Sequence, residues 1–213
     1  MQKTLLTLAL VAGLTGAAHA QRSVRARSQA SSGPSLGVKA GGSLSTLTNT
    51  DDIAYESIYG YHAGVFANLT LSRHFAFQPE LLYSQKGAKY PAAPGILATR
   101  RLHYADLPLL FHVNANGFFL EAGPQVGVLL AARDKVGDMT NSLNRELYFT
   151  SADFSFVGGL GFQRKSGLGG GFRYVGGLTS INKSTSLGTT AVQREAQNSV
   201  LQLYLTYSFN ALN

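Results

Sequence analysis

The sequence contains no cysteine, so the protein must be stable without disulfide bonds. Beyond the first twenty residues, no segment approaches the ~18 uninterrupted apolar residues that indicate a membrane-spanning helix. Charged residues make up only 14% of the chain, the helix formers Glu and Lys are sparse, and glycine is frequent at 24 residues. This composition favours β-structure with many turns over helices. The length of 213 residues suffices for one domain and is marginal for two.

The formal net charge of +7 comes from basic residues that are dispersed along the chain rather than clustered. Nucleic-acid binding is therefore not expected, and a cationic surface facing acidic lipid headgroups is the more sensible use of the charge. The histidines are isolated and show no metal-ligand spacing, and the glycine-rich stretches contain no strand-to-helix phosphate loop. We expect no metal, no cofactor and no catalytic residues.

The start of the chain, "MQKTLLTLALVAGLTGAAHA", has the layout of a secretory signal peptide over residues 1–20. Lys3 gives a charged start, an apolar stretch follows, and small residues precede the expected cleavage after Ala20. A membrane anchor or buried helix is the alternative, but the apolar stretch is shorter than the ~20 residues of a spanning helix. Residues 21–34 carry three arginines without periodicity and predict a flexible periplasmic lead-in. Residues 35–213 then form one domain.

About eight segments alternate apolar and polar residues with a period of two, which predicts β-strands. They span residues 35–47, 59–71, 75–86, 102–114, 118–130, 153–163, 168–178 and 200–209. In "FFLEAGPQVGVLL", for example, Phe118 and Leu120 fall on one face, whereas Glu121 and Gln125 fall on the other. Because proline cannot donate to the ladder, bulges or strand ends are expected near the prolines at positions 79, 108 and 124.

The predicted connections alternate between short and long. Short turns occur at 72–74, 115–117 and 164–167, and long gaps at about 48–58, 87–101, 131–152 and 179–198. Short periplasmic turns and long external loops are typical of outer-membrane barrels, and each strand is long enough for a tilted crossing. The sequence therefore predicts an all-β fold, an eight-stranded antiparallel up-and-down transmembrane β-barrel. The alternative is a soluble lipocalin-like barrel with apolar side chains inside.

Several stretches resemble a known family, the PorT-like outer membrane β-barrels that are common in Bacteroidetes. They are "FQPELLYSQKG", "YADLPLLFHV", "FFLEAGPQVGVLL", "FSFVGGLGF" and "LQLYLTYSF". The resemblance implies an eight-stranded barrel in the cell outer membrane, without a defined activity. The last strand resembles the signal that the outer-membrane insertion machinery recognises, although Phe209 is followed by "NALN" instead of ending the chain.

The alternation assigns two sets of side chains. A polar network is predicted inside the barrel, formed by Lys39, His62, Glu80, Lys86, Asp106, His112, Glu121 and Arg173. An eight-stranded barrel is filled by its own side chains, so the carboxylates and cations of this set are expected to neutralise one another. Membrane-interface aromatics are predicted as two girdles, with Phe75, Phe118, Phe162 and Phe209 at the periplasmic end and Tyr59, Tyr83 and Phe154 at the external end.

These features favour a structural or interaction protein without catalysis. Its expected partners are outer-membrane lipid and lipopolysaccharide, or a protein bound at external loops. Those loops hold the basic residues Lys89, Arg100, Arg101, Arg133, Lys135, Arg145, Lys183 and Arg194. A narrow porin-like channel for ions or small solutes is the alternative. A lipid-modifying enzyme is the third hypothesis, with His103, Glu56 and Ser84 as a conceivable set whose spacing marks no nucleophile.

Overall fold

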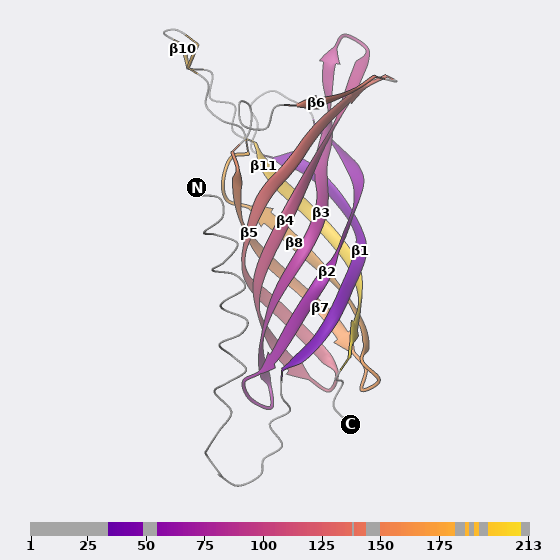
Figure 1. The fold of residues 1–213 in the computed structure, drawn as a ribbon, viewed down its shortest axis with the longest axis vertical. Helices are drawn as coiled ribbons and strands as arrows, with labels where there is room; N and C mark the ends of the chain where they lie inside the picture. Colours follow the sequence, from indigo (N-terminus) through magenta and orange to yellow (C-terminus); the bar gives the residue numbers. More distant parts are fainter. Residues whose placement is uncertain are drawn as a thin grey trace, which may run out of the picture. The chain divides into compact units, whose positions relative to one another are not determined.

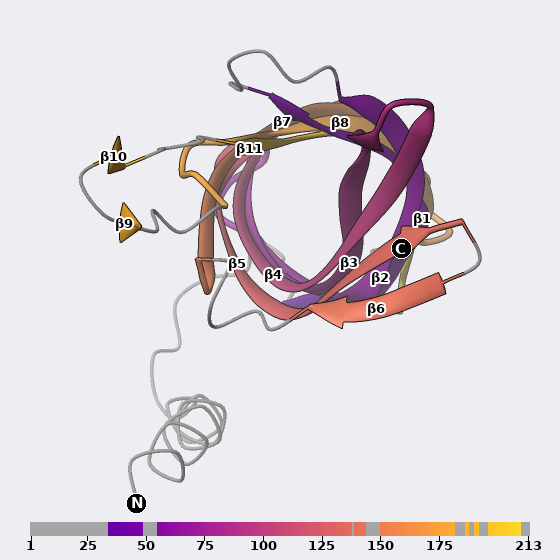
Figure 2. The same ribbon diagram turned by 90° about the horizontal axis from the view of Figure 1, so that it is seen from above.

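The computed structural model describes residues 34–48, 55–137, 139–143, 150–181, 186–187, 190–191 and 196–209. The predicted signal peptide and nearly all of the predicted lead-in therefore lie outside the described residues. Eight long strands are β1 (Ser35–Thr48), β2 (Glu56–Thr70), β3 (Phe75–Ala93), β4 (Ile96–Ala115), β5 (Phe118–Val136), β7 (Ala152–Gln163), β8 (Leu168–Gly177) and β11 (Gln197–Ser208). Each of them pairs antiparallel with its neighbours, and β11 pairs with β1, so the sheet closes into a ring (Figure 1, Figure 2). This confirms the predicted eight-stranded barrel.

Three short strands complete the described structure. β6 (Met139–Leu143) pairs with the far end of β5, and β9 (Ser186–Leu187) pairs with β10 (Thr190–Ala191). No helix within the described ranges is long and apolar enough to cross a membrane.

The barrel has two distinct ends. At the first, which we call the turn end, the connections β2–β3, β4–β5 and β7–β8 are short; the second, which we call the loop end, is where β1 and β3 end and β2 and β4 begin. Between β4 and β5 the turn has two residues, and both Asn116 (φ 52°) and Gly117 (φ 88°) have positive φ. Two-residue hairpin loops of this kind match the twist of the strands that they join.

The long gap predicted for residues 87–101 is wrong. β3 and β4 stay paired as far as Ala93 opposite Ile96, and the β3–β4 hairpin projects from the ring at the loop end beside the β5–β6 hairpin (Figure 1). In this part of the chain the inward positions hold small residues such as Ala88 and Ala98, both fully buried. Alternation between alanine and polar residues is a weak signal, so the recognisable pattern ends before the strands do.

The bulges expected at three prolines are also absent. Beside Pro79, Pro108 and Pro124, the pairing with one neighbouring strand skips two residues and then resumes in the same register. The register shifts in the described strands lie elsewhere, for example at His103/Tyr104. Losing one ladder donor therefore opens the sheet locally without inserting a residue.

The side chains are arranged inside out relative to a soluble protein. Outward positions carry exposed apolar residues around the ring, such as Phe118 (64% exposed) and Leu203 (69% exposed). Inward positions carry charged and polar residues, and Arg173 is fully buried. The lipocalin-like alternative, which required apolar side chains inside, is therefore wrong. An exposed apolar belt on a closed sheet is stable where lipid surrounds it.

Apolar side chains also lie inside, mainly near the loop end. A cluster that we call the loop-end cluster buries Leu47, Ala88, Leu102, Tyr104, Leu129, Ala132, Ile181 and Ala196. Ile181 and Ala196 come from the segments after β8 and before β11, and the amide of Ile181 donates to the carbonyl of Ala196 over 2.8 Å. These segments thus bring apolar groups over the interior. Four more residues, Leu110, Val157, Val175 and Val200, form a second cluster.

Candidate functional site in the barrel interior

Four charged side chains from four strands meet inside the barrel and form what we call the central network. Lys39 of β1 and Arg173 of β8 both contact Glu80 of β3, with Lys39 Nζ 2.5 Å from Glu80 Oε1 and Arg173 Nη1 2.9 Å from Glu80 Oε2. Glu121 of β5 lies on the other side of Lys39, at 3.9 Å. Two cations and two carboxylates therefore balance, which buried charges require.

Neutral side chains complete this network. Gln78 donates to Glu80 over 2.9 Å, Arg173 donates to Gln202 over 2.6 Å, and the Tyr204 hydroxyl donates to Glu121 over 2.9 Å. The Lys39 ammonium also lies 4.0 Å from the centre of the Tyr204 ring. These hydrogen bonds and the cation–π contact replace part of the hydration that the charges lose.

Glycine makes room for this network. Gly159 of β7 lies opposite Arg173 in the sheet. A Cβ atom at this position would be 2.5 Å from the Cβ of Arg173 and 2.9 Å from Glu121 Oε1. Any larger residue would have to displace the charged groups, so the glycine-rich strand is part of the site.

A second charged group lies nearer the loop end. Lys86 of β3 is 3.0 Å from Asp106 of β4 and 3.7 Å from Asp153 of β7, and Asn198 donates to Asp153 over 3.0 Å. The Lys86 ammonium lies 4.6 Å from the centre of the Tyr104 ring. One lysine thus bridges two carboxylates at the base of the loop-end cluster.

The structure places all eight residues of the predicted interior set inside the barrel, where each is buried. It brings five of them together, because His112 Nε2 lies 3.4 Å from Glu121 Oε2 beside the central network. Lys86 and Asp106 belong to the second group. His62 is also buried, and its ring nitrogens have no hydrogen-bond partner among the described residues.

Sequence reasoning missed several members of both groups. None of five buried residues that contact the charges, Asp153, Tyr104, Tyr204, Gln202 and Asn198, belongs to the predicted interior set. Asp153 stands two positions before the inward-facing Ser155, so following the alternation of β7 back by one step places it on the inward face as well. Tyr104 and Tyr204 point inward, but tyrosine is also common on the lipid-facing side of a strand. Only its position in the alternation shows which way such a residue points.

All seven predicted interface aromatics lie on the outer surface and are exposed. Phe118 and Phe162 pack with ring centres 4.9 Å apart at the turn end. Towards the loop end, Tyr83 contacts the ring of Tyr61 at 6.0 Å and hydrogen-bonds His103 Nδ1 over 2.6 Å. Their anchoring role at a membrane interface stays a prediction.

The conceivable enzyme set is not brought together. Ser84 is buried inside the barrel, whereas His103 faces outward on the neighbouring strand and bonds Tyr83. Glu56 is exposed and lies 4.0 Å from Lys89. Within the described part of the chain, no group of three or more His, Asp or Glu residues could hold a metal ion.

Beyond the apolar belt, the projecting strands carry a hydrogen-bonded cluster on their inner side. Arg100 of β4 donates two hydrogen bonds to the Asp134 carboxylate of β5, at 2.9 and 2.7 Å. Tyr90 of β3 donates to the same carboxylate over 2.6 Å. Burial raises the pKa of the Tyr90 phenol, and its hydrogen bond to Asp134 acts in the same direction. The phenol therefore stays a neutral donor, and the cluster ties three strands together.

The outer side of the same strands is basic. On β3, β4 and β5 the outward residues change from apolar to polar just beyond Tyr83, His103 and Ala131. The next outward positions on β4 and β5 are Arg101 and Arg133, which lie directly opposite each other in the sheet and are both exposed.

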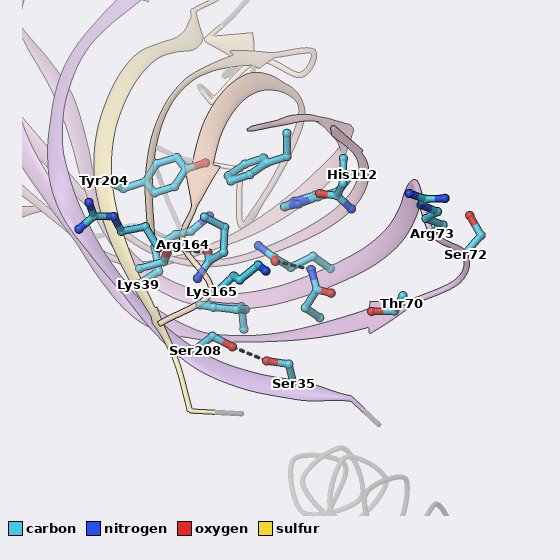
Figure 3. Close-up of a pocket in the computed structure, with 17 residues that line it drawn as sticks. Ser35, Lys39, Thr70, Ser72, Arg73, His112, Arg164, Lys165, Tyr204 and Ser208 are labelled. Carbon is cyan, nitrogen blue, oxygen red and sulfur yellow. Dashed lines mark hydrogen bonds between the residues drawn. The ribbon is translucent and has the colours of Figure 1, made fainter. Parts of the chain in front are cut away.

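The turn end opens into a polar cavity of about 320 Å³, which we call the vestibule (Figure 3). Its walls include Lys39, Arg73, His112, Arg164 and Lys165, together with hydroxyl and amide side chains, and no carboxylate is among the lining residues. Ser35 and Ser208 hydrogen-bond at its edge, next to the closure of β1 on β11.

Comparison with known proteins identifies the family. The family model described as "Outer membrane protein beta-barrel domain" matches residues 20–183, most of the chain, so the protein belongs to this family of the cell outer membrane. No curated protein sequence matches the chain.

Solved structures of outer-membrane proteins are similar to this one. For Neisserial surface protein A the TM-score is 0.51 at 15% identity, with 84% of this chain and 100% of that chain covered. At this identity the likeness concerns the fold alone. Ail, the attachment invasion locus protein of Yersinia pestis, gives 0.45 at 11% identity (84% and 100% covered), and OprG from Pseudomonas aeruginosa gives 0.44 at 10% identity (83% and 96% covered).

Proposed function

We propose that this barrel is a non-catalytic structural or interaction protein that acts through its loop end on the cell exterior, with its turn end in the periplasm. Short turns face the periplasm in barrels of this kind. We further propose that residues 1–20 are a cleaved signal peptide, that 21–34 are a flexible lead-in, and that the chain belongs to the PorT-like branch. The stretches "PELLYSQKG" and "LEAGPQVG" support the last assignment.

The observation that carries this proposal is the basic outer face of the projecting strands. Like charges directly opposite each other in a sheet destabilise it, and no described carboxylate forms an ion pair with Arg101 or Arg133. An external anion between the two guanidinium groups would remove that repulsion. The pair lies just past the apolar belt, at the height where phosphate groups of outer-leaflet lipopolysaccharide are expected.

The side chains inside the barrel give less support to the alternative function, a narrow channel. The cations of the central network are matched by carboxylates, and apolar groups of the loop-end cluster lie between the second charged group and the exterior. An ion would have to disrupt paired charges and then pass apolar side chains. We therefore keep the interior charges as a structural filling of the barrel.

The test is binding of purified lipopolysaccharide to the full chain refolded in a zwitterionic detergent. Replacing both opposed arginines, R101Q/R133Q, should weaken binding by about tenfold, since each lost charge-assisted contact contributes roughly 1.5–3 kcal/mol before screening. The matched control R25Q/R27Q removes two positive charges from the proposed lead-in and should bind like the wild type. Equal loss in both variants, or no loss in R101Q/R133Q, would contradict the assignment.

A further inference from the structure

The vestibule at the turn end combines a cavity with an excess of positive charge. Arg73 lies in the β2–β3 connection, and Arg164 and Lys165 lie in the β7–β8 turn. Figure 3 shows Arg164 and Lys165 beside Lys39 on one side of the cavity and Arg73 on the opposite side. The basic groups thus surround the opening instead of gathering at one edge.

These three turn residues have no carboxylate to neutralise them within the described structure. The described acids of the turn-end half are Glu80 and Glu121, and both are already engaged by Lys39, Arg173 or Tyr204 in the central network. The other described acids lie in the second charged group or towards the loop end. Among the described residues, the central network is therefore balanced in charge, whereas the opening of the vestibule carries three cations that no carboxylate matches.

Charge alone would be solvated on a flat surface, but the vestibule also supplies shape and neutral donors. Its volume of about 320 Å³ corresponds to roughly ten water molecules at the share that each takes in liquid water. Asn114, Thr206 and Ser208 are among its lining residues and offer amide and hydroxyl groups. Arginine forks combined with hydroxyl and amide donors match the oxygens of a phosphate.

We propose that the vestibule binds a phosphate group presented from the periplasm. A phosphate monoester carries up to two negative charges, so it matches the three unmatched cations better than a single carboxylate does. The sequence before the barrel is itself basic, with Arg22, Arg25 and Arg27, so its charge does not complement that of the vestibule. The phosphate comes either from a soluble phosphorylated molecule or from a lipid headgroup of the inner leaflet.

The test uses the full chain with R101Q/R133Q as background, so that anion binding at the loop end does not contribute. The refolded protein in zwitterionic detergent is titrated with sodium tripolyphosphate, and backbone amide shifts are followed by NMR. Saturable shifts are expected at residues 72–74 and 164–167, with the loop-end amides unchanged. Adding R164Q/K165Q should weaken binding by about tenfold, and adding Arg73→Gln should weaken it further. Adding Lys89→Gln is the matched control and should change nothing.

A second arm separates the two sources of phosphate. The same background protein is placed in zwitterionic nanodiscs with and without phosphatidic acid, whose headgroup is a phosphate monoester. If phosphatidic acid alone shifts the amides of 164–167, the ligand is a lipid; if only tripolyphosphate does, it is soluble. Folding of each variant is checked by its migration on an unboiled gel. No shift with either probe, or undiminished shifts after the turn-end cations are removed, would overturn the proposal.

Discussion

Removing the carboxylate of Glu80 is the most informative perturbation of the barrel interior. Glu80 accepts from Lys39 at 2.5 Å, from Arg173 at 2.9 Å and from Gln78 at 2.9 Å, and its side chain is fully buried. In Glu80→Leu, two buried cations would face Glu121 alone, which is 3.9 Å from Lys39. Leaving a buried charge without its partner costs about 3–5 kcal/mol, so the free energy of unfolding should fall by that amount.

The assay is urea unfolding of the barrel in lipid vesicles, followed by gel migration of unboiled samples. The double variant Glu80→Leu/Arg173→Leu removes one charge of each sign, and its loss should be smaller than the sum of the two single losses by roughly 1–3 kcal/mol. The control Glu56→Leu breaks an exposed pair with Lys89 and should cost less than about 1 kcal/mol. Strictly additive losses, or a loss in Glu80→Leu no larger than in the control, would refute the balanced-network reasoning.

Three further predictions concern other parts of the barrel. Gly159→Ala should destabilise or block folding because its Cβ would meet the Arg173 side chain at 2.5 Å and the Phe172 carbonyl at 2.8 Å, whereas Gly158→Ala, with nothing within 4 Å, should unfold like the wild type in urea. Asp134→Asn should weaken the bidentate pair with Arg100 and speed hydrogen exchange in the β3–β4 hairpin; unchanged exchange would show that this pair does not order it. The wild-type protein should show no conductance steps above background in planar bilayers, and regular steps would favour the channel hypothesis.

The sequence was sufficient for the architecture because a lipid-facing strand repeats its environment every two residues. The outward face of each strand is predicted by apolar residues such as Phe118 and Leu120. The short connections predict which strands pair as hairpins. The pattern failed where the chain leaves the apolar belt. There, alanine takes inward positions that hold charged and polar residues elsewhere, and arginine takes outward positions that hold apolar residues elsewhere, so the ends of β3, β4 and β5 give little signal.

The alternation of residues along each strand predicts which residues belong to the interior set, but it does not predict which of them contact one another. Glu80 is separated from Lys39 by 41 residues and from Arg173 by 93 residues. Which of the interior charges meet depends on the stagger of the closed sheet, and alternation within a strand contains no information about that stagger. The vestibule was likewise hidden, because Arg73 stands in one turn and Arg164 and Lys165 in another, and only the closed ring brings these two turns to one opening.

The central claim, that the chain forms a closed barrel in the outer membrane, is tested most directly by fractionating native cells and running the outer-membrane fraction on a gel with and without boiling. The account predicts that the protein is found in that fraction and that the unboiled sample migrates differently from the boiled one. Recovery of the protein as a soluble periplasmic species, with the same migration in both samples, would contradict it.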